Sequence, residues 1–225
     1  MRRVKEPGYT PQTGDEATHP LQASLRRLAE TLKGLRSYRQ AALMLLAWVI
    51  YNDGINTIIS NATLYGTTLG FSRDALIVAV LLVQFVGIPF SFAFGALAGR
   101  IGPKASILIG LAMYTCISVF AYTMTTVVEF YILAMLVATV QGGTQALSRS
   151  LFASMIPKQK ASEFFGFFSI FDKFAGILGP MVFGTATVLT GSLRNGILSL
   201  IAFFVVGGII LLSVNVAAGR KEAEH

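Results

Sequence analysis

The stretch FFSIFDKFAGILGP, residues 167–180, is apolar almost throughout, yet it carries Asp172 and Lys173 next to each other. A carboxylate and an ammonium group are costly in apolar surroundings unless each finds a partner. The way this stretch folds therefore depends on the solvent around it, and the composition of the whole chain identifies that solvent.

The composition is that of an integral membrane protein. Of the 225 residues, 54% are hydrophobic and 13% are charged, whereas a soluble domain has about 25% charged residues. The 22 glycines fit this class, because glycine is more frequent in transmembrane helices than in soluble ones. Residues 1–40 contain no apolar run, so we expect no secretory signal there.

Six apolar segments are long enough to cross a bilayer, which takes about 20 residues. Together they predict an all-α, six-helix transmembrane domain over residues 41–218. The expected spans are 41–62, 74–97, 105–124, 127–148, 164–189 and 196–218.

Positive charge alternates between the connections. Those near 63–73, 125–126 and 190–195 carry only Arg73 and Arg194, and every other lysine or arginine outside the spans belongs to the opposite side. The positive-inside rule then places both termini, including the tail 219–225, in the cytoplasm of a cell-membrane protein. This explains the net charge of +7 without nucleic acid as a partner.

The segment before the first span has two parts. Residues 1–20 are polar and predict a disordered lead-in. In 21–38, leucines recur every three or four residues among basic side chains. This pattern favours a basic amphipathic helix on the anionic inner leaflet, and a short coiled coil is the alternative.

The residues do not favour an enzyme. His19 and His225 lie outside all six spans, and Cys116 is the only cysteine, so no disulfide and no cysteine-built metal site is expected. The sequence has no phosphate-binding loop or dinucleotide fingerprint. We expect no cofactor and no bound metal.

Polar side chains within the spans are the candidate functional residues, because such groups are costly in lipid and usually face a protein interior or a water-filled path. Their alternative role is to hydrogen-bond packed helices together, and for Gln84 the two interpretations are equally good. Asn52, Asp53 and Asn56 can share one helical face, as can Gln141 and Gln145. The candidates for the solute path are Asn52, Asp53, Asn56, Gln84, Gln141, Gln145, Asp172 and Lys173.

Lys173 is expected deep in the membrane. It lies ten residues after Glu163, or roughly 15 Å along a helix, near the middle of the hydrocarbon core. Because neighbours in sequence do not face each other on a helix, Asp172 and Lys173 are expected to address other helices. Asp53 is a candidate partner.

The second half of the fifth segment contains Gly176, Gly179, Pro180 and Gly184. Small residues let helices approach closely, and proline permits a bend. A bendable helix beside a polar midplane suits alternating access.

Several motifs resemble a known family. GALAGRIGPK (residues 95–104) resembles the short cytoplasmic loop motif of the major facilitator superfamily, with Gly99 where Asp is usual. YNDGINT (51–57), QALSRS (145–150) and EFFG (163–166) resemble the branch of the autophagy-linked vacuolar amino-acid effluxers and their bacterial homologues. The resemblance covers nearly all of 41–218 and implies the C-terminal six-span half of a transporter, built as a 3+3 inverted repeat, with 1–40 as the linker between halves.

The resemblance and the polar midplane together indicate a secondary transporter, or half of one, for a small polar or zwitterionic solute, with amino acids implied by the resemblance alone. A second six-span half, either another copy or a separate chain, is the expected partner besides lipid. The rival is a non-transporting membrane protein, either a remnant or an accessory subunit. The candidate gating residues, whose alternative role is ordinary charged anchoring, are Arg100, Lys104, Arg149 and Glu163.

Overall fold

The computed structural model describes residues 38–224, so most of the expected amphipathic helix at 21–38 lies outside the described residues. Within them, six helical segments are long and apolar enough to cross a membrane, as predicted. The first four are α2 (Arg39–Thr68), α3 (Arg73–Ile101), α4 (Pro103–Thr123) and α5 (Val127–Ala153). The fifth consists of α6 (Ala161–Phe174) and α7 (Leu178–Thr190), and the sixth of α8 (Leu193–Ser199) and α9 (Ile201–Ser213). A 3₁₀ turn, η1 (Lys158–Lys160), precedes α6, and α10 (Val216–Glu224) follows α9.

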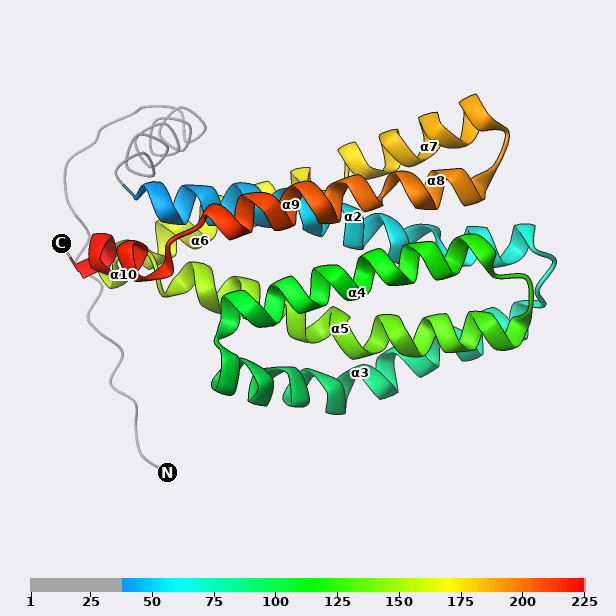
Figure 1. Cartoon of the computed structure of the whole chain (residues 1–225), viewed down its shortest axis with the longest axis horizontal. Coiled ribbons are helices and arrows are strands. Elements are labelled where there is room, and N and C mark those ends of the chain that lie inside the picture. The colour runs from blue at the N-terminus through cyan, green and yellow to red at the C-terminus, as the bar shows by residue number, and fades with distance from the viewer. Residues whose placement is uncertain (1–37, 225) are drawn as a thin grey trace, which may run out of the picture.

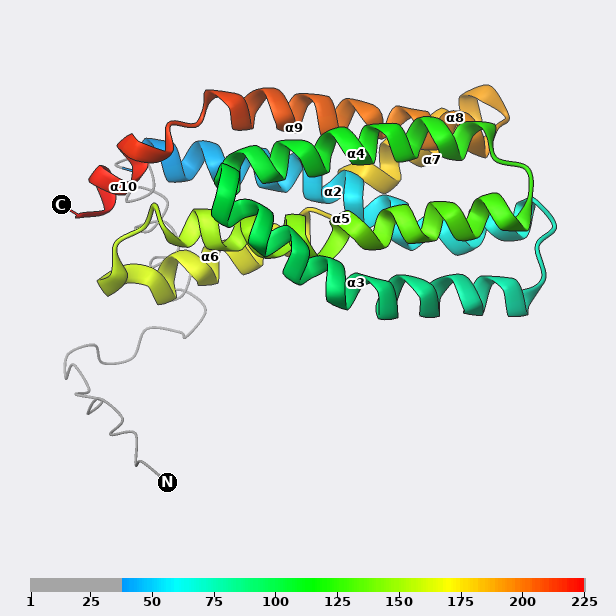
Figure 2. The same ribbon diagram turned by 60° about the horizontal axis from the view of Figure 1, so that its bottom comes forward.

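The helices run along one long axis, and their connections gather at its two ends (Figure 1). The α2–α3, α4–α5 and α7–α8 connections share one end, while the start of α2, the η1 turn and α10 share the other (Figure 2). A hollow of about 570 Å³ at this second end is lined by Lys158, Lys160 and Arg220, among others. The basic connections therefore cluster at one end of the bundle.

Local sequence signals explain where several helices begin and end. The Ser72 side chain accepts a hydrogen bond from the Ala75 amide at the start of α3. At the start of α5, Thr126 and Glu129 form a reciprocal capping box, which satisfies two otherwise free amides. Gly102 separates α3 from α4 with a φ of 88°, a conformation that glycine adopts without strain.

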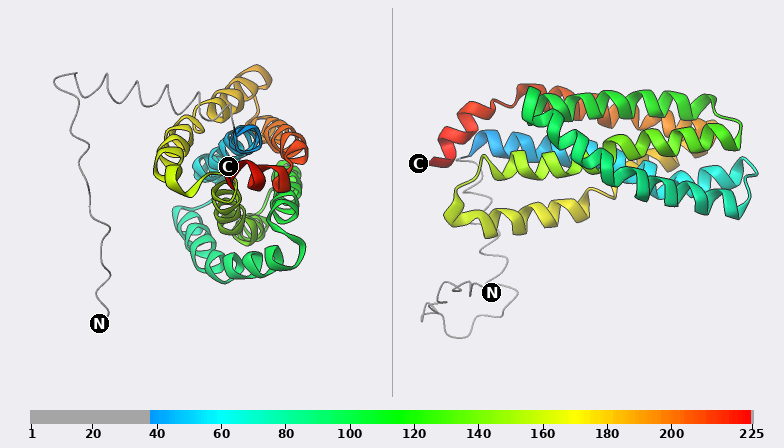
Figure 3. Two further views of the ribbon diagram at one scale, coloured as in Figure 1. Left: turned by 90° about the vertical axis from the view of Figure 1, so that its left-hand side faces the viewer. Right: turned by 90° about the horizontal axis from the view of Figure 1, so that it is seen from below.

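The first span, α2, lies in the middle of the bundle, between the fifth span and α9 (Figure 3). It packs closely on α9 because small residues face it. A Cβ on Gly207 would lie 2.9 Å from Tyr51 Cβ, and one on Gly54 would lie 3.0 Å from Phe203 Cβ. Close approach at glycines is the usual way in which membrane helices associate.

The outer surface is strongly apolar. Phe85 and Phe92 on α3 are 71% and 75% exposed, and Val188 and Leu189 on α7 are 82% and 80% exposed. A water-soluble protein rarely exposes so much contiguous apolar surface, whereas lipid or another membrane segment covers it without cost.

Two spans differ from their predicted form. The fifth was expected as one bendable helix over 164–189, but it is interrupted between Phe174 and Leu178. The sixth was expected over 196–218, but it runs from Leu193 to Ser213, and a separate helix, α10, follows. The glycines and proline of the fifth span explain the first difference, as described below.

Candidate functional site

The interruption in the fifth span lies near the middle of the segment that runs from Lys158 to Thr190. Pro180 explains its position, since proline lacks the amide hydrogen that would bond the Gly176 carbonyl and its ring clashes with a helical carbonyl there. The interruption creates two helix ends inside an apolar segment. Free backbone groups at such ends need partners, because lipid supplies none.

α2 supplies partners to both ends. Asp53 Oδ2 accepts a hydrogen bond of 2.7 Å from the Gly179 amide in the first turn of α7, and the Leu178 amide also interacts with this carboxylate. Asn56 Nδ2 donates to the Ala175 carbonyl, 3.4 Å away, at the end of α6. Two side chains from one face of α2 therefore hold the two halves of the fifth span.

The Asp53 contact is buried and tightly packed. Asp53 is 1% exposed, and Thr57, one turn later, donates a 2.7 Å hydrogen bond to the Asp53 carbonyl. A Cβ on Gly179 would meet the Thr57 hydroxyl and would lie 2.8 Å from the Asp53 carbonyl oxygen. Only glycine fits between the two helices at this position.

A second set of polar contacts joins α2, α5 and α6. Asn52 Nδ2 donates to Asp172 Oδ1 at 3.2 Å, and Gln145 Nε2 donates to Asn52 Oδ1 at 3.5 Å. An Arg149 nitrogen lies 3.7 Å from Asp172 Oδ2, and the two side chains are 55% and 37% exposed. The carboxylate of Asp172 therefore has a partner on each of two other helices, as the sequence predicted in general terms.

Lys173 lies in the last turn of α6, and its side chain is exposed. The partner that the sequence suggested for it, Asp53, instead binds the start of α7. The C-terminal end of a helix carries partial negative charge and the N-terminal end partial positive charge. Lys173 and Asp53 thus place a cation near one new helix end and an anion at the other.

Gln84 and Gln141 lie apart from this interruption. They line a groove of about 350 Å³ between α2, α3 and α5, whose other lining residues include Phe130 and Leu133. The buried Oε1 atom of Gln141 has no hydrogen-bond partner among the described residues. The eight candidate path residues therefore form two groups, six near the interruption and two in this groove.

The four candidate gating residues have different surroundings. Lys104 Nζ donates to the carbonyls of Leu212 and Val214 at 2.8 and 2.7 Å, and so caps the C-terminal end of α9. Arg149 contacts Asp172 instead of Glu163, which is exposed in the first turn of α6. Arg100 is exposed in the last turn of α3. No hydrogen bond or ion pair joins any two of these four residues, all of which lie in the described part of the chain.

The three glycines of the fifth span differ in how closely other atoms approach them. Gly179 makes the close contact with α2, whereas a Cβ on Gly176 would meet nothing nearer than the Lys173 carbonyl at 3.9 Å. A Cβ on Gly184 would meet nothing within 4 Å. Pro180 falls in the first turn of α7, where a missing amide hydrogen costs little.

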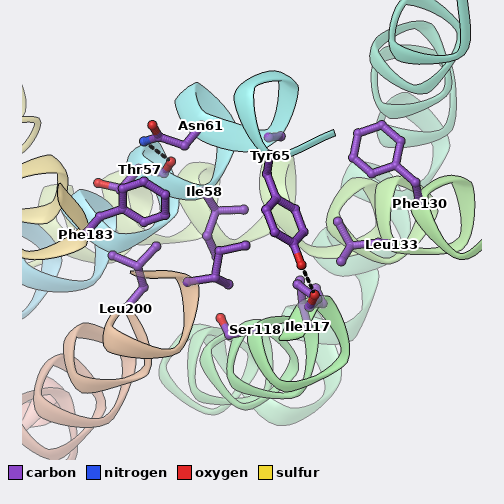
Figure 4. Close-up of a pocket in the computed structure, with 13 residues that line it drawn as sticks. Thr57, Ile58, Asn61, Tyr65, Ile117, Ser118, Phe130, Leu133, Phe183 and Leu200 are labelled. Atoms are coloured by element: carbon purple, nitrogen blue, oxygen red, sulfur yellow. Dashed lines mark hydrogen bonds between the residues drawn. The ribbon is translucent and has the colours of Figure 1, made fainter. Parts of the chain in front are cut away.

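A small cavity lies beyond the interruption, between α2, α4, α5, α7 and α8 (Figure 4). Its volume is about 30 Å³, and its walls are almost entirely apolar. Tyr65, at one side, donates a 2.7 Å hydrogen bond to the Ala121 carbonyl, and Asn61 bonds the Thr57 carbonyl. A cavity of this volume has room for only a water molecule or two, so it is too small to be a solute site. Residues 38–224 also contain no group of three His, Cys, Asp or Glu side chains that could hold a metal ion.

Comparison with known proteins identifies the family. The family described as "Vacuole effluxer Atg22 like" matches residues 3–224. The chain belongs to this family. Its relatives include the uncharacterized MFS-type transporter YxiO of Bacillus subtilis (strain 168), which is 47% identical over 191 residues, or 85% of this chain and 45% of the relative.

Fungal members are more distant. Autophagy-related protein 22 of Yarrowia lipolytica is 29% identical over 236 residues, which cover 94% of this chain and 40% of the relative. The protein of the same name from Cryptococcus neoformans var. neoformans serotype D is 32% identical over 200 residues, 80% and 36% of the two chains. The chain thus spans less than half the length of these relatives.

Sequence reasoning missed some residues that fix the helices around this candidate site. The Tyr51 hydroxyl and the Ser148 hydroxyl form a short, buried hydrogen bond between α2 and α5. The Trp48 and Phe168 rings, 3.9 Å apart, join α2 to α6. A signal for the first pair was present, because Tyr51 and Ser148 both fall within the motifs 51–57 and 145–150 that carry the family resemblance.

Proposed function

We propose that the chain forms one six-span half of an MFS-type secondary transporter, which moves a small polar solute by alternating access. The solute path would run along α2, α5 and the interrupted fifth span. The observation that carries the proposal is the polar network at the interruption, where α2 side chains meet both halves of one span and α5 side chains contact α2 and the first half. Interrupted helices in transporters commonly form binding sites near the bilayer midplane.

The charges of the network favour a zwitterionic solute. Asp172 and Arg149 are both partly exposed, and Lys173 is exposed. A solute with one ammonium and one carboxylate group could bind Asp172 on one side and Arg149 or Lys173 on the other, with charge-assisted hydrogen bonds. Amino acids have this chemistry, and the name of the family, vacuole effluxer, describes a transport function.

A single six-span half lines only one side of a path, so we propose a second half as partner. The exposed apolar surface of α3 and α7 is available to pack against this second half. The partner would be another copy of this chain or a separate six-span chain, related by an axis along the membrane normal. The basic end of the bundle, with Lys158, Lys160 and Arg220, would face the cytoplasm of a cell-membrane protein, together with both termini.

Uptake by vesicles that contain the purified chain tests this proposal, with a panel of radiolabelled neutral amino acids as the probe. Lys173→Met keeps the apolar stem and removes the charge, and we expect it to reduce uptake at least about tenfold, since a charge-assisted contact is worth about 1.5–3 kcal/mol. Lys158→Met is the matched control, because Lys158 is exposed in η1, before α6 begins, whereas Lys173 lies in the last turn of α6.

Cross-linking in the same vesicles establishes whether the chain has assembled. Undiminished uptake by Lys173→Met would show that Lys173 has no part in the path. If assembled wild-type chain takes up none of the panel, the rival interpretation of a non-transporting accessory protein is favoured instead.

A further inference from the structure

A basic hollow at one end of the bundle lies outside the candidate solute path. Its walls come from α10, from η1 and from the residues at the start of α2 and the end of α5, which gather at the same end (Figure 2). Its volume of about 570 Å³ is that of a small-molecule site. Three cationic side chains line it, Lys158 and Lys160 from η1 and Arg220 from α10, together with one carboxylate, that of Glu224.

The described part of the chain does not neutralise these cations. Within residues 38–224, the ion pair formed is that of Arg149 with Asp172, at another place in the bundle. The second glutamate of α10, Glu222, does not line the hollow, and its carboxylate accepts a 3.3 Å hydrogen bond from the Gln40 amide. The hollow therefore has a net positive charge, which suits an anion.

Contacts with α2 hold α10 in place as one wall of the hollow. Gln40 Oε1 accepts a 2.7 Å hydrogen bond from the amide of Asn215, just before α10. The Asn215 side chain in turn accepts a 3.0 Å hydrogen bond from the Ala218 amide in the first turn of α10. A Cβ on Gly219 would lie 2.9 Å from Gln40 Cβ, so α10 packs directly on the first turn of α2. The fold thus positions the cation that α10 contributes.

The hollow lies where the membrane spans end. Tyr38, which directly precedes α2, and Ala153, the last residue of α5, both line it. The ends of membrane spans lie at the level of the phospholipid head groups, where tyrosine is enriched. Basic pockets on the cytoplasmic side at this level bind anionic head groups. The position of the hollow therefore favours a lipid phosphate over a soluble anion.

We propose that the hollow binds the phosphodiester head group of an anionic phospholipid such as phosphatidylglycerol. The planar guanidinium of Arg220 can bind two phosphate oxygens, while Lys158 and Lys160 each donate from a compact ammonium group. The Tyr38 hydroxyl adds a neutral donor. A bound head group would fasten η1, and with it the start of α6, to α10. The site depends on the fold and the membrane; only its place in the inner leaflet rests on the orientation proposed above.

Native mass spectrometry of the full chain, released from micelles that contain phosphatidylglycerol, measures the affinity of each bound lipid. We expect Arg220→Gln and Lys160→Gln each to weaken the tightest binding event about fivefold, a factor that corresponds to about 1 kcal/mol for one cation at a membrane surface. Lys221→Gln is the matched control. It removes the same charge at the next position of α10, outside the hollow, and should leave the affinity close to that of the wild type.

Three results of this measurement would overturn the proposal. Equal weakening by Arg220→Gln and Lys221→Gln would show that a diffuse positive surface attracts the lipid. Phosphatidylcholine that binds as tightly as phosphatidylglycerol would show that the charge of the head group is not recognised. Displacement of the lipid by an equal concentration of inorganic phosphate would identify a site for a soluble anion instead.

Acylation of lysine side chains provides a second measurement, which needs no variant. A bound head group should protect Lys158 and Lys160 from an amine-reactive ester in nanodiscs of phosphatidylglycerol, compared with nanodiscs of phosphatidylcholine. Lys221 is exposed and does not line the hollow, so it reports the effect of the anionic surface alone. Equal protection of all three lysines, or protection of none, would contradict the proposal.

Neither measurement involves uptake, so failure of the lipid site and failure of the proposed transport are distinguishable. In vesicles of phosphatidylcholine alone the hollow would hold no anionic lipid. The uptake control Lys158→Met is therefore to be measured in such vesicles, where loss of this lysine cannot act through the lipid site.

Discussion

Gly179→Ala should be among the most damaging single-methyl additions in the membrane domain. The new Cβ would lie 2.8 Å from the Asp53 carbonyl oxygen and 2.9 Å from Asp53 Oδ1, and would also meet the Thr57 hydroxyl. Real Cβ atoms essentially never approach other heavy atoms closer than 3.0 Å. The Thr57 hydroxyl can rotate away, but the carbonyl of Asp53 belongs to the backbone of α2 and can move only with that helix.

The loss of stability expected for Gly179→Ala has three contributions. Overpacking of a well-packed contact typically costs about 1–3 kcal/mol. Rotation of Thr57 breaks its hydrogen bond to the Asp53 carbonyl, which is worth about 1 kcal/mol. Separation of the helices lengthens the hydrogen bond from Gly179 to Asp53, for which about 1 kcal/mol is a conservative loss. We therefore expect Gly179→Ala to lower the free energy of unfolding by roughly 3–5 kcal/mol.

Unfolding of the purified chain in mixed detergent micelles, followed by far-ultraviolet circular dichroism, measures this difference. Gly184→Ala is the matched control on the same helix, because its Cβ would meet nothing within 4 Å. It should be neutral or stabilise the chain by roughly 0.5–1 kcal/mol, since alanine loses less backbone entropy than glycine. Equal stability of the two variants would refute the close packing of α2 on α7.

Two further predictions concern residues near the helix ends. Lys104→Met removes the cap of α9, and we expect it to lower the free energy of unfolding by about 1 kcal/mol. Lys104→Arg should remain closer to the wild type. A loss of uptake without any loss of stability would instead favour a gating role for Lys104. A double-mutant cycle with Arg149→Gln and Asp172→Asn measures the coupling energy of this ion pair. We expect it to lie below about 1 kcal/mol, because both side chains are partly exposed. A much larger coupling energy would show that lipid, not water, surrounds the pair.

The spans could be predicted because bilayer thickness and helix geometry together set their length. All six follow from hydropathy alone. The gathering of basic connections at one end follows from the alternation of strongly and weakly basic connections along the chain. Less could be predicted about where a span is interrupted. Gly176, Gly179 and Pro180 indicated a weak point, but whether it becomes a bend or an interruption depends on Asp53 and Asn56, which stabilise the free backbone groups from another helix.

The sequence indicated which residues gather at the candidate site, but only in part which of them bind one another. The shared face of Asn52, Asp53 and Asn56 followed from helical spacing. The role of Lys104 as a helix cap could not be inferred, because its carbonyl partners lie more than 100 residues away in the sequence. A polar side chain in a membrane span is recognisable from sequence, whereas its partner depends on how the helices pack.

The interruption also explains why residues 167–180 can carry Asp172 and Lys173. In an unbroken span both charges would lie at a helix centre, where the cost of a single lysine alone is about 2.5–3.5 kcal/mol. In the folded chain they lie in the last turn of α6, where the negative helix end favours the lysine. Asp172 is bonded by Asn52 and lies beside Arg149, while Asp53 provides the complementary negative charge at the start of α7. The charges and the interruption therefore stabilise each other, so a change that straightened the span would also leave Asp53 and Lys173 without their helix ends.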